Sequence, residues 1–326
     1  MKARLTIAIP TFNRARLLRR ALQSATAQTS QQIEILVSDN GSTDNTQDVI
    51  AEFKDRRLRS IRREFTVPRA QHGTLIFAET ESEFILVLSD DDYIEPEFSS
   101  EVLKLFDEHP EISFAYTGCI EHYDNQMLPA LTGPRIESSL NFIAAHYSGN
   151  RQVSWCACVT RVSDLRRLGP QPDNRIIGDM YFWTKIAFQG PVGCVTRPLS
   201  HYTVLVPGGD NESRTTPILA WAEDIERLGD EVLEYVRNAH APPAYEVALI
   251  AHMGRQLTRS IANQFIWARL FGMSRTACIR PFLKSLAYRG WDIRGISRVL
   301  AAFLLNRTTL RKLVVRGISK LADQRA

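Results

Sequence analysis

Short apolar runs alternate with amphipathic segments over the first 120 residues, and this pattern predicts strands alternating with helices. The apolar runs of strand length are 5–9, 33–37, 58–62 and 84–88. The expected helices are 14–28, a segment through Val49, Ile50 and Phe53, 75–78, and 96–109. Asn13 is the expected N-cap of the first helix. The order favours an α/β fold with a Rossmann-like, doubly wound, mostly parallel sheet flanked by helices.

The pattern changes along the second half of the chain. Further strands are expected at 113–116, 153–159, 192–195 and 201–206, with a helix at 181–188 and a flexible loop at 207–213. Beyond about residue 217 the periodicity is helical to the end, apart from a break at 241–243. We therefore predict a first domain over 1–215 and a helical, basic C-terminal extension over 216–326.

The composition indicates a cellular compartment and shows that charge is unevenly distributed along the chain. The five cysteines are scattered and odd in number, which suits a reducing cytoplasm better than a disulfide framework. No signal peptide or membrane-spanning stretch is visible. Residues 275–326 carry a net charge of +10 within a total of +4, so the preceding 274 residues carry −6. A basic tail on an acidic body suggests an anionic partner such as a membrane surface.

Three consecutive carboxylates follow the apolar run at 84–88. A buried strand would deliver Asp90, Asp91 and Asp92 to its carboxyl end, where open α/β sheets bind ligands. Adjacent carboxylates repel one another, and a divalent cation removes that cost. Carboxylate oxygens suit Mg²⁺ or Mn²⁺, which usually binds through one or two carboxylates plus substrate phosphates. The alternative is a solvated acidic turn that caps the next helix.

Several ordered motifs follow one another over roughly residues 3–215. They are Ile9-Pro10-Thr11-Phe12-Asn13-Arg14, Val37-Ser38-Asp39-Asn40-Gly41-Ser42-Thr43-Asp44, Leu88-Ser89-Asp90-Asp91-Asp92, Gly178-Asp179-Met180-Tyr181-Phe182-Trp183, Gly190-Pro191-Val192-Gly193 and Arg197-Pro198-Leu199-Ser200-His201-Tyr202. Together they resemble the family 2 glycosyltransferases of GT-A fold. Motifs in this order and spacing are far more specific than any one of them. The chain looks most like bacterial transferases that build O-antigen, capsule or exopolysaccharide repeats.

The resemblance implies binding residues for a nucleotide-diphosphate sugar, with a UDP-sugar favoured. It assigns the nucleobase to Asp39 and to the backbone of Pro10, Thr11 and Phe12. It assigns the metal to Asp91, and ribose or metal to Asp90. Further candidates for donor contacts are Asn13, Arg14, Asn40 and Arg69, and for metal contacts Asp92 and His201. For Asn40 the alternative is turn chemistry, and for His201 it is a structural histidine.

The resemblance also implies an inverting reaction, for which Asp179 is the expected general base. A carboxylate must take the acceptor hydroxyl proton opposite the leaving diphosphate. Relatives usually have Glu-Asp where this chain has Gly178-Asp179, so the second acid of the pair is retained. The alternative for Asp179 is an N-cap of the following helix.

The basic C-terminal helices and the implied chemistry point to the membrane surface. Amphipathic cationic helices favour anionic lipids, and a polyprenyl-linked saccharide acceptor would lie there. We therefore expect a cytoplasmic enzyme at the inner face of the cytoplasmic membrane, with a glycan or lipid-linked acceptor, no nucleic acid partner, and a tail that allows a homodimer. Alternatives are a sugar-nucleotide nucleotidyltransferase, or a non-catalytic protein that binds nucleotide sugars or glycans.

Overall fold

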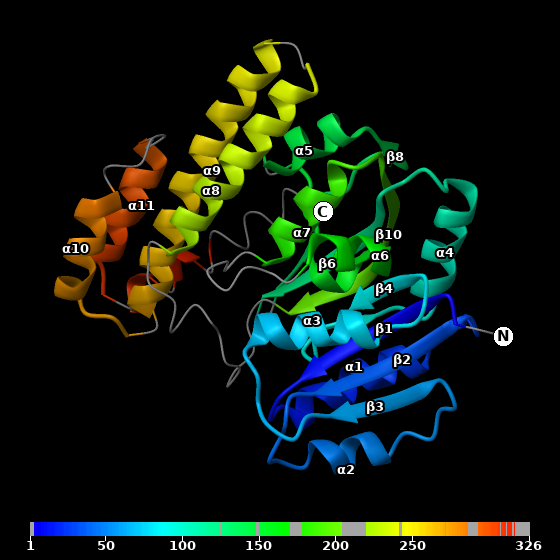
Figure 1. The fold of residues 1–326 in the computed structure, drawn as a ribbon. Coiled ribbons are helices and arrows are strands. Elements are labelled where there is room, and N and C mark those ends of the chain that lie inside the picture. Colours follow the sequence, from blue (N-terminus) through cyan, green and yellow to red (C-terminus); the bar gives the residue numbers. More distant parts are fainter. Residues whose placement is uncertain are drawn as a thin grey trace. The chain divides into compact units, whose positions relative to one another are not determined.

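A computed structural model gives the fold of the chain (Figure 1). It divides into two units, Met1–Phe142 with Arg151–Val206, and Ile143–Asn150 with Pro207–Ala326. The predicted boundary at 215 lies outside the described residues, as does the predicted loop at 207–213. The structure describes residues 3–123, 126–147, 150–169, 178–203, 220–240, 243–270, 272–285, 293–306, 308–310, 312–314 and 316.

The first half of the sheet consists of the four predicted parallel strands. They are β1 (Leu5–Thr11), β2 (Ile33–Asp39), β3 (Leu58–Arg62) and β4 (Phe84–Val87), in the spatial order β3-β2-β1-β4. The central strand β1 is buried almost throughout, as a strand covered on both faces requires. Because β1 pairs in parallel with both β2 and β4, the carboxyl ends of all three strands meet at one edge.

The second half of the sheet is mixed. Beyond β4 follow β9 (Cys158–Arg161), β6 (Phe114–Tyr123), β10 (Val192–Thr203) and β5 (Tyr93–Ile94). Strand β9 is antiparallel to both neighbours, whereas β6 and β10 are parallel to each other and run in the direction of β1. Two short strands complete the sheet: β7 (Gln126–Pro129) pairs with β6, and β8 (Ile136–Glu137) pairs with β10. The expectation of a mostly parallel sheet is confirmed.

Helices lie on both faces of this sheet, as Figure 1 shows for α1 and α3. The first unit contains α1 (Ala15–Thr26), α2 (Thr46–Ala51), α3 (Arg69–Glu79), α4 (Phe98–Glu108), α6 (Val162–Leu168) and α7 (Gly178–Ala187). Helix α5 (Ser139–Tyr147) crosses the boundary between the units. The buried positions of α1 are Ala15, Leu18, Ala21, Leu22 and Ala25, the stripe that the sequence pattern predicts.

Two predicted strands differ from the structure. The expected strand at 153–159 is wrong in its first half, where Trp155–Ala157 forms a 3₁₀ turn and β9 begins only at Cys158. The Trp155 ring packs against Trp183 at 4.6 Å, a tertiary contact that periodicity does not reveal. The strand expected at 192–195 and the first residues of the one expected at 201–206 are joined as β10, which carries register shifts around Pro198. Residues 204–206 lie outside the described residues. A Cβ on Gly118, opposite this irregularity, would meet the carbonyl oxygen of Arg197 at 2.7 Å.

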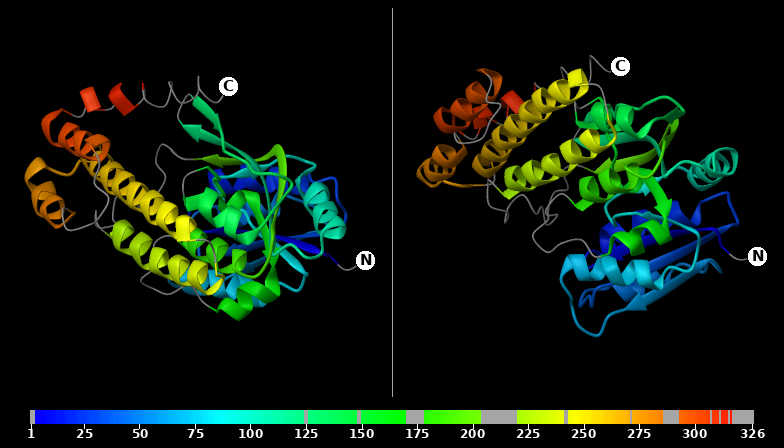
Figure 2. Two further views of the ribbon diagram at one scale, coloured as in Figure 1. Left: turned by 90° about the horizontal axis from the view of Figure 1, so that it is seen from above. Right: turned by 45° about the horizontal axis from the view of Figure 1, so that its top comes forward.

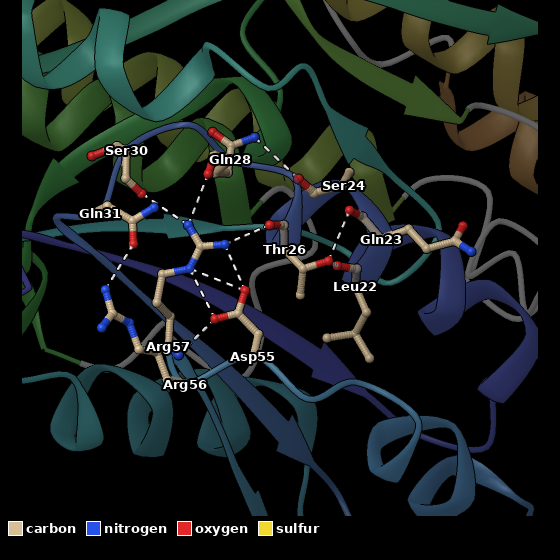
Figure 3. A network of polar contacts seen from close by, with 10 residues as sticks. All are labelled: Leu22, Gln23, Ser24, Thr26, Gln28, Ser30, Gln31, Asp55, Arg56 and Arg57. Atoms are coloured by element: carbon tan, nitrogen blue, oxygen red, sulfur yellow. Dashed lines mark hydrogen bonds and ion pairs between the residues drawn. The ribbon is translucent and has the colours of Figure 1, made fainter.

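Arg57 ties the connection between α1 and β2 to the connection between α2 and β3 (Figure 3). Its side chain is mostly buried and pairs with Asp55 at 2.7 Å. It donates to the carbonyl oxygens of Thr26 at 2.6 Å, Gln28 at 2.9 Å and Ser30 at 3.0 Å. These carbonyls lie at the end of α1 and in the connection to β2, where no helix or strand hydrogen bond is available to them. The Arg57 guanidinium supplies the missing donors.

We expect Arg57→Ala to lower the free energy of unfolding by about 2–3 kcal/mol, because it leaves part-buried carbonyls without a donor. Arg56→Ala is the matched control, since Arg56 is exposed and its side chain donates to Gln31 at 3.4 Å on the surface. Its expected change is within about 0.5 kcal/mol. Urea unfolding followed by tryptophan fluorescence measures both, and equal losses would contradict this role for Arg57.

The second unit is helical. It contains α8 (Ala220–Asn238), α9 (Pro243–Leu270), α10 (Arg275–Ser285) and α11 (Ile293–Leu304). Helices α8 and α9 lie side by side in both views of Figure 2, and α11 also packs on α9. The Phe265 and Phe303 rings meet at 5.9 Å, and Arg269 donates to the carbonyl oxygen of Ala302. Among the described residues, we find no helix with the length and apolar character that crossing a membrane requires.

Candidate functional site

The candidate site lies at the carboxyl edge of β2, β1 and β4. Strand β1 ends at Thr11 and β2 at Asp39, and the acidic run follows β4 directly. Two backbone hydrogen bonds fix these ends together: the Asn40 amide donates to the Thr11 carbonyl at 2.9 Å, and the Leu88 amide to the Ala8 carbonyl at 2.9 Å. The fold thus brings together the sequence motifs at 9–14, 37–44 and 88–92.

Asp90 is the buried member of the acidic run. Its side chain is 3% exposed, accepts a hydrogen bond from the Thr11 hydroxyl at 2.8 Å, and pairs with Arg14 at 2.9 Å. Burial raises the pKa of Asp90 to about 7, and the positive charge of Arg14 opposes that rise. The carboxylate is therefore held in place by partners from β1 and from the residue before α1.

Asp91 is the accessible member, with 21% of its side chain exposed. One carboxylate oxygen accepts from Arg14 at 2.5 Å. Its backbone carbonyl accepts from the Thr203 hydroxyl at 2.6 Å and from the Arg20 guanidinium. Two elements far apart in the sequence, α1 and β10, thus hold the main chain at Asp91 while its carboxylate stays open to a ligand.

Asp92 faces inward. Its side chain is 1% exposed, and Oδ1 accepts from the Thr203 amide at 2.8 Å. Oδ2 has no hydrogen-bond partner within the described parts of the chain. Burial, and next the charge of Asp91, raise the pKa of Asp92 well above its usual value. Asp92 thus supports the end of β10, and its assignment as a metal ligand stays a prediction.

His201 belongs to a separate polar cluster on β5, β6 and β10. Nε2 donates to Glu95 at 2.7 Å, and Nδ1 lies 3.0 Å from Nε2 of His122. The imidazole also stacks on the Tyr93 ring with centroids 4.1 Å apart. Because both ring nitrogens are engaged, the structure favours the alternative of a structural histidine, and the assignment of His201 as a metal ligand stays a prediction.

Asp39 holds the turn after β2. It is fully buried, and its two oxygens accept from the Ser42 amide at 2.8 Å and from the Gln47 side chain at 2.6 Å. The Arg62 guanidinium lies 3.7 Å away. The turn includes Gly41 with φ of 83°, a conformation that favours glycine. Each carboxylate oxygen retains acceptor capacity beyond these contacts, so a nucleobase contact at Asp39 stays a prediction.

Asn40 fastens the loop that precedes α3. Its amide group donates to the Val67 carbonyl at 2.9 Å and accepts from the Val67 amide at 3.0 Å. These two hydrogen bonds support the alternative interpretation of Asn40, in which its side chain stabilises a turn. Arg69 begins α3 directly after that loop and is exposed.

The segment 10–14 enters the site from β1. Pro10 is half-buried, Thr11 is buried, and Phe12 is 41% exposed. Asn13 has φ of 53°, and its side-chain oxygen accepts from the Thr43 amide at 2.7 Å. The prediction that Asn13 caps α1 is therefore wrong.

The cap of α1 comes from a neighbouring turn. Asp44 accepts from the Ala15 amide at 3.1 Å, and its other oxygen accepts from the Thr46 amide and hydroxyl. A side chain 29 residues along the chain thus replaces the local cap. Aspartate side chains commonly cap helices by accepting from a backbone amide of the first turn, and Asp44 does so for α1.

His72 lies beneath this edge. It is buried, and its Nε2 lies 2.8 Å from the Ser38 hydroxyl. Burial, and next the charge of Arg63, lower the pKa of His72 from 6.5 to about 4. The neutral imidazole is therefore the form that the folded chain stabilises.

We expect the pH dependence of stability to reflect His72. Its folded pKa lies below its unfolded pKa of 6.5, so the unfolded chain takes up a proton as pH falls from 6.5 towards 4, and stability is lost in that window. His72→Gln should remove up to about 3 kcal/mol of the stability difference between pH 7 and pH 4. Urea unfolding at pH 7 and at about pH 4 measures this, with His109→Gln, a partly exposed histidine, as control. An unchanged pH dependence in His72→Gln would contradict the assignment.

Asp179 lies in the first turn of α7, but its side chain lies outside the described residues. Its proposed role as base therefore stays a prediction.

Arg20 and Thr203 are the site residues that sequence reasoning missed. Arg20 donates to Thr203 at 2.8 Å and lies over the Tyr93 ring at 4.8 Å. No local motif marks either residue, since their importance depends on α1 and β10 meeting at Asp91.

The carboxylates of Asp90 and Asp91 suit a cation that a bound ligand also coordinates. Asp91 offers an accessible carboxylate, and Asp90 lies beside it under Arg14. Within the described ranges, no three His, Cys, Asp or Glu side chains are grouped so as to enclose a metal. Mg²⁺ and Mn²⁺ in nucleotide sites rarely need such an enclosure, because phosphate oxygens and water complete the coordination.

Comparison with known proteins gives sequence relatives and a matching fold. Residues 6–160 match the family model described as glycosyl transferase family 2. An uncharacterized glycosyltransferase of Nostoc sp. is 29% identical over 294 residues, 86% of this chain and 89% of the relative. A GalNAc(5)-diNAcBac-PP-undecaprenol beta-1,3-glucosyltransferase of Campylobacter jejuni is 26% identical over 156 residues, 45% of this chain and 49% of the relative.

The fold matches that of S. aureus TarS 1-349, whose crystal structure is in complex with UDP-GlcNAc. The TM-score is 0.63 at 16% sequence identity, and the match covers 97% of this chain and 92% of that one. The GT-A fold that the motifs imply is thereby confirmed.

Proposed function

Because residues 6–160 match the glycosyl transferase family 2 model, we propose that the chain is a glycosyltransferase of that family, an inverting, metal-assisted enzyme that uses a nucleotide-diphosphate sugar. The acceptor in this proposal is a hydroxyl of a glycan or of a lipid-linked saccharide. One observation carries the proposal: Asp90 and Asp91 lie together at the carboxyl edge of β1 and β4 and share one guanidinium. A paired anionic site at this edge suits a cation that carries a diphosphate.

The proposed donor site follows this edge of the sheet. We assign the nucleobase to Asp39 and the backbone at Pro10–Phe12, the ribose to Asp90, and the metal to Asp91. Arg14 and Arg69 are the candidates for phosphate contacts, because guanidinium groups match phosphate geometry. Mn²⁺ or Mg²⁺, when bound, neutralises the diphosphate leaving group. A UDP-sugar is the favoured donor, in line with the ligand of the structurally similar TarS.

We assign the proton transfer to Asp179. Its carboxylate would take the proton of the acceptor hydroxyl while the hydroxyl oxygen forms the new bond to the anomeric carbon. The bond from that carbon to the diphosphate oxygen breaks on the opposite face, which inverts the configuration. Placement in the first turn of α7 is compatible with this role and with an N-cap contribution.

We propose that the second unit contacts an anionic membrane surface. Exposed apolar side chains on α10 and α11, among them Ile279, Leu283, Leu300 and Leu304, alternate with exposed Arg280 and Arg298. Such helices bind the headgroup region through apolar burial and charge. The Campylobacter relative's name specifies an undecaprenol-linked substrate, which supports a lipid-linked acceptor here.

Replacing both Leu300 and Leu304 by Glu should lower binding to liposomes that contain phosphatidylglycerol at least about tenfold, because it removes apolar burial and adds negative charge. Sedimentation with liposomes measures this. Met127→Glu, an exposed apolar residue of β7, is the control and should bind as the wild type does. Equal binding of all three proteins would remove the membrane proposal.

Release of nucleoside diphosphate tests the catalytic proposal. The protein is incubated with UDP-, GDP-, dTDP- and CDP-sugars, Mn²⁺ and a lipid-linked saccharide extract. We expect release from one nucleotide class, and loss of release when a chelator removes the metal. Turnover that persists fully with chelator would contradict metal assistance, and the absence of release from every donor would contradict transfer.

A further inference from the structure

The carboxylate of Asp39, to which the proposed function assigns the nucleobase, is covered by its neighbours. Its side chain is fully buried. Oδ1 accepts from the Ser42 amide at 2.8 Å, and Oδ2 accepts from the side-chain nitrogen of Gln47 at 2.6 Å. The Arg62 guanidinium lies 3.7 Å from Oδ2. A ligand that approaches from solvent therefore meets a neighbouring side chain before it meets the carboxylate.

The side-chain amide of Gln47 is held in one orientation. A carboxylate accepts hydrogen bonds and donates none, so the amide nitrogen faces Asp39 and the carbonyl oxygen Oε1 faces away from it. Gln47 is half-buried, and within the described parts of the chain its Oε1 accepts no hydrogen bond. Its backbone lies in the first turn of α2, where Asp44 accepts from the Thr46 amide and hydroxyl. Gln47 thus presents a carbonyl acceptor on a fixed turn.

An exposed aromatic ring follows the strand residue that pairs with Asp39. Thr11 of β1 is in register with Asp39 of β2, and the Asn40 amide donates to the Thr11 carbonyl at 2.9 Å. Phe12 comes directly after Thr11 and is 41% exposed. An exposed ring and a fixed acceptor at the same strand ends suit a planar heterocycle, which can stack on the ring and donate an N–H to the acceptor.

The orientation of the Gln47 amide distinguishes uracil from cytosine. The two bases have nearly the same shape, but N3 of uracil carries a proton, whereas N3 of cytosine carries a lone pair. A carbonyl oxygen accepts from the first and is repelled by the second. An amide turned the other way would present its nitrogen and favour cytosine. A site built for one hydrogen-bonding pattern rejects the base that lacks it.

We propose that Gln47, oriented by Asp39, accepts the N3–H of uracil and so selects a uridine diphosphate donor over a cytidine diphosphate donor. This inference rests on the proposed function, because it assumes that a nucleoside diphosphate binds at this edge of the sheet. It refines the nucleobase assignment: Gln47 touches the base, and Asp39 is the positioning residue that fixes the amide of Gln47.

Calorimetric titration with UDP and with CDP, both in the presence of Mn²⁺, tests this inference without any turnover. Gln47→Met keeps the length of the side chain and removes the amide. The control is Gln23→Met, at an exposed glutamine of α1. Circular dichroism verifies that each variant is folded.

The wild type and Gln23→Met should bind UDP at least about tenfold more tightly than CDP. In Gln47→Met the ratio should fall below about threefold, because no group is left that tells an N–H from a lone pair. Metal-dependent binding itself should persist in Gln47→Met, since the substitution leaves Asp90 and Asp91 unchanged. A solvated glutamine with no part in recognition would leave the ratio as it is.

Asp39→Asn tests the orientation directly. The Ser42 amide keeps an oxygen at the position of Oδ1, so the new amide nitrogen takes the position of Oδ2 and faces Gln47. Gln47 then turns its carbonyl toward position 39 and its nitrogen toward the base. CDP should therefore bind more tightly than UDP in Asp39→Asn, and the double variant Asp39→Asn/Gln47→Met should lose this reversal.

A wild-type affinity ratio near or below one, or an unchanged ratio in Gln47→Met, would overturn the inference. The second result leaves the donor site in place and gives the base to Asp39 itself. UDP preference that persists in a folded Asp39→Asn variant would contradict the positioning role, and Gln47→Met decides the question if Asp39→Asn does not fold. If none of UDP, GDP, dTDP and CDP binds to the wild type, the proposed donor site fails and the inference fails with it. If another diphosphate binds and UDP does not, the donor site stands and the selection of uracil is wrong.

Discussion

Asp179→Asn is expected to lower transfer by about 10³-fold while nucleotide binding stays within about twofold of the wild type. The amide is nearly isosteric with the carboxylate but cannot accept the acceptor proton. The donor assignments lie on β1 and the turn after it, on β2, at the start of α3 and on the segment after β4, none of which includes α7. The substitution should therefore change the rate and not the affinity for the diphosphate.

Turnover and calorimetric titration of the diphosphate together measure this effect. Asp107→Asn is the matched control, because Asp107 is an exposed residue of α4 that pairs with Arg4 at 2.7 Å. The control should retain wild-type transfer. If Asp179→Asn turns over at the wild-type rate, the base is another residue, and Asp179 is left with the capping role.

Asp91→Asn is expected to abolish the metal dependence of diphosphate binding and to lower transfer by about 10³-fold, equivalent to about 4 kcal/mol. Asp91 is the accessible carboxylate of the run, and an amide is a much weaker ligand for a hard cation. The main chain at Asp91 is held through its carbonyl by Thr203 and Arg20, so the substitution should leave the local fold intact.

The neighbouring Asp92→Asn variant is the control for Asp91. Asp92 is buried, its pKa is raised well above the usual value, and the Thr203 amide donates to it, a contact that an asparagine oxygen can accept. Metal-dependent binding should survive in Asp92→Asn and fail in Asp91→Asn. Calorimetric titration of the diphosphate with Mn²⁺ distinguishes the two, and the opposite result would move the metal ligand to Asp92.

The sequence predicted the sheet well where burial alone decides the structure. The apolar runs that became β1 to β4 are of strand length, and their parallel order places Thr11, Asp39 and Asp90 at one edge. Prediction failed where tertiary contacts override local pattern. Packing of Trp155 on Trp183 accompanies a 3₁₀ turn in place of a strand, and Asp44 caps α1 in place of Asn13.

For the candidate site too, the sequence predicted what local pattern determines and missed what tertiary contacts determine. Motif spacing located the acidic run, but it could not separate accessible Asp91 from buried Asp92, because that difference depends on Thr203 in β10. It also could not show that His201 is engaged by Glu95 and His122, which lie on other elements. Side-chain roles that depend on residues 79 or more positions away are not visible in a local motif.

Calorimetric titration of the wild-type protein with UDP, GDP, dTDP and CDP, each with and without Mn²⁺, tests the central claim most directly. The claim is that the edge formed by Asp90 and Asp91 holds a nucleoside diphosphate through a divalent cation. We predict tight binding of one diphosphate, with UDP favoured, that requires Mn²⁺. Equal affinity with and without Mn²⁺, or no binding of any of the four, would contradict it.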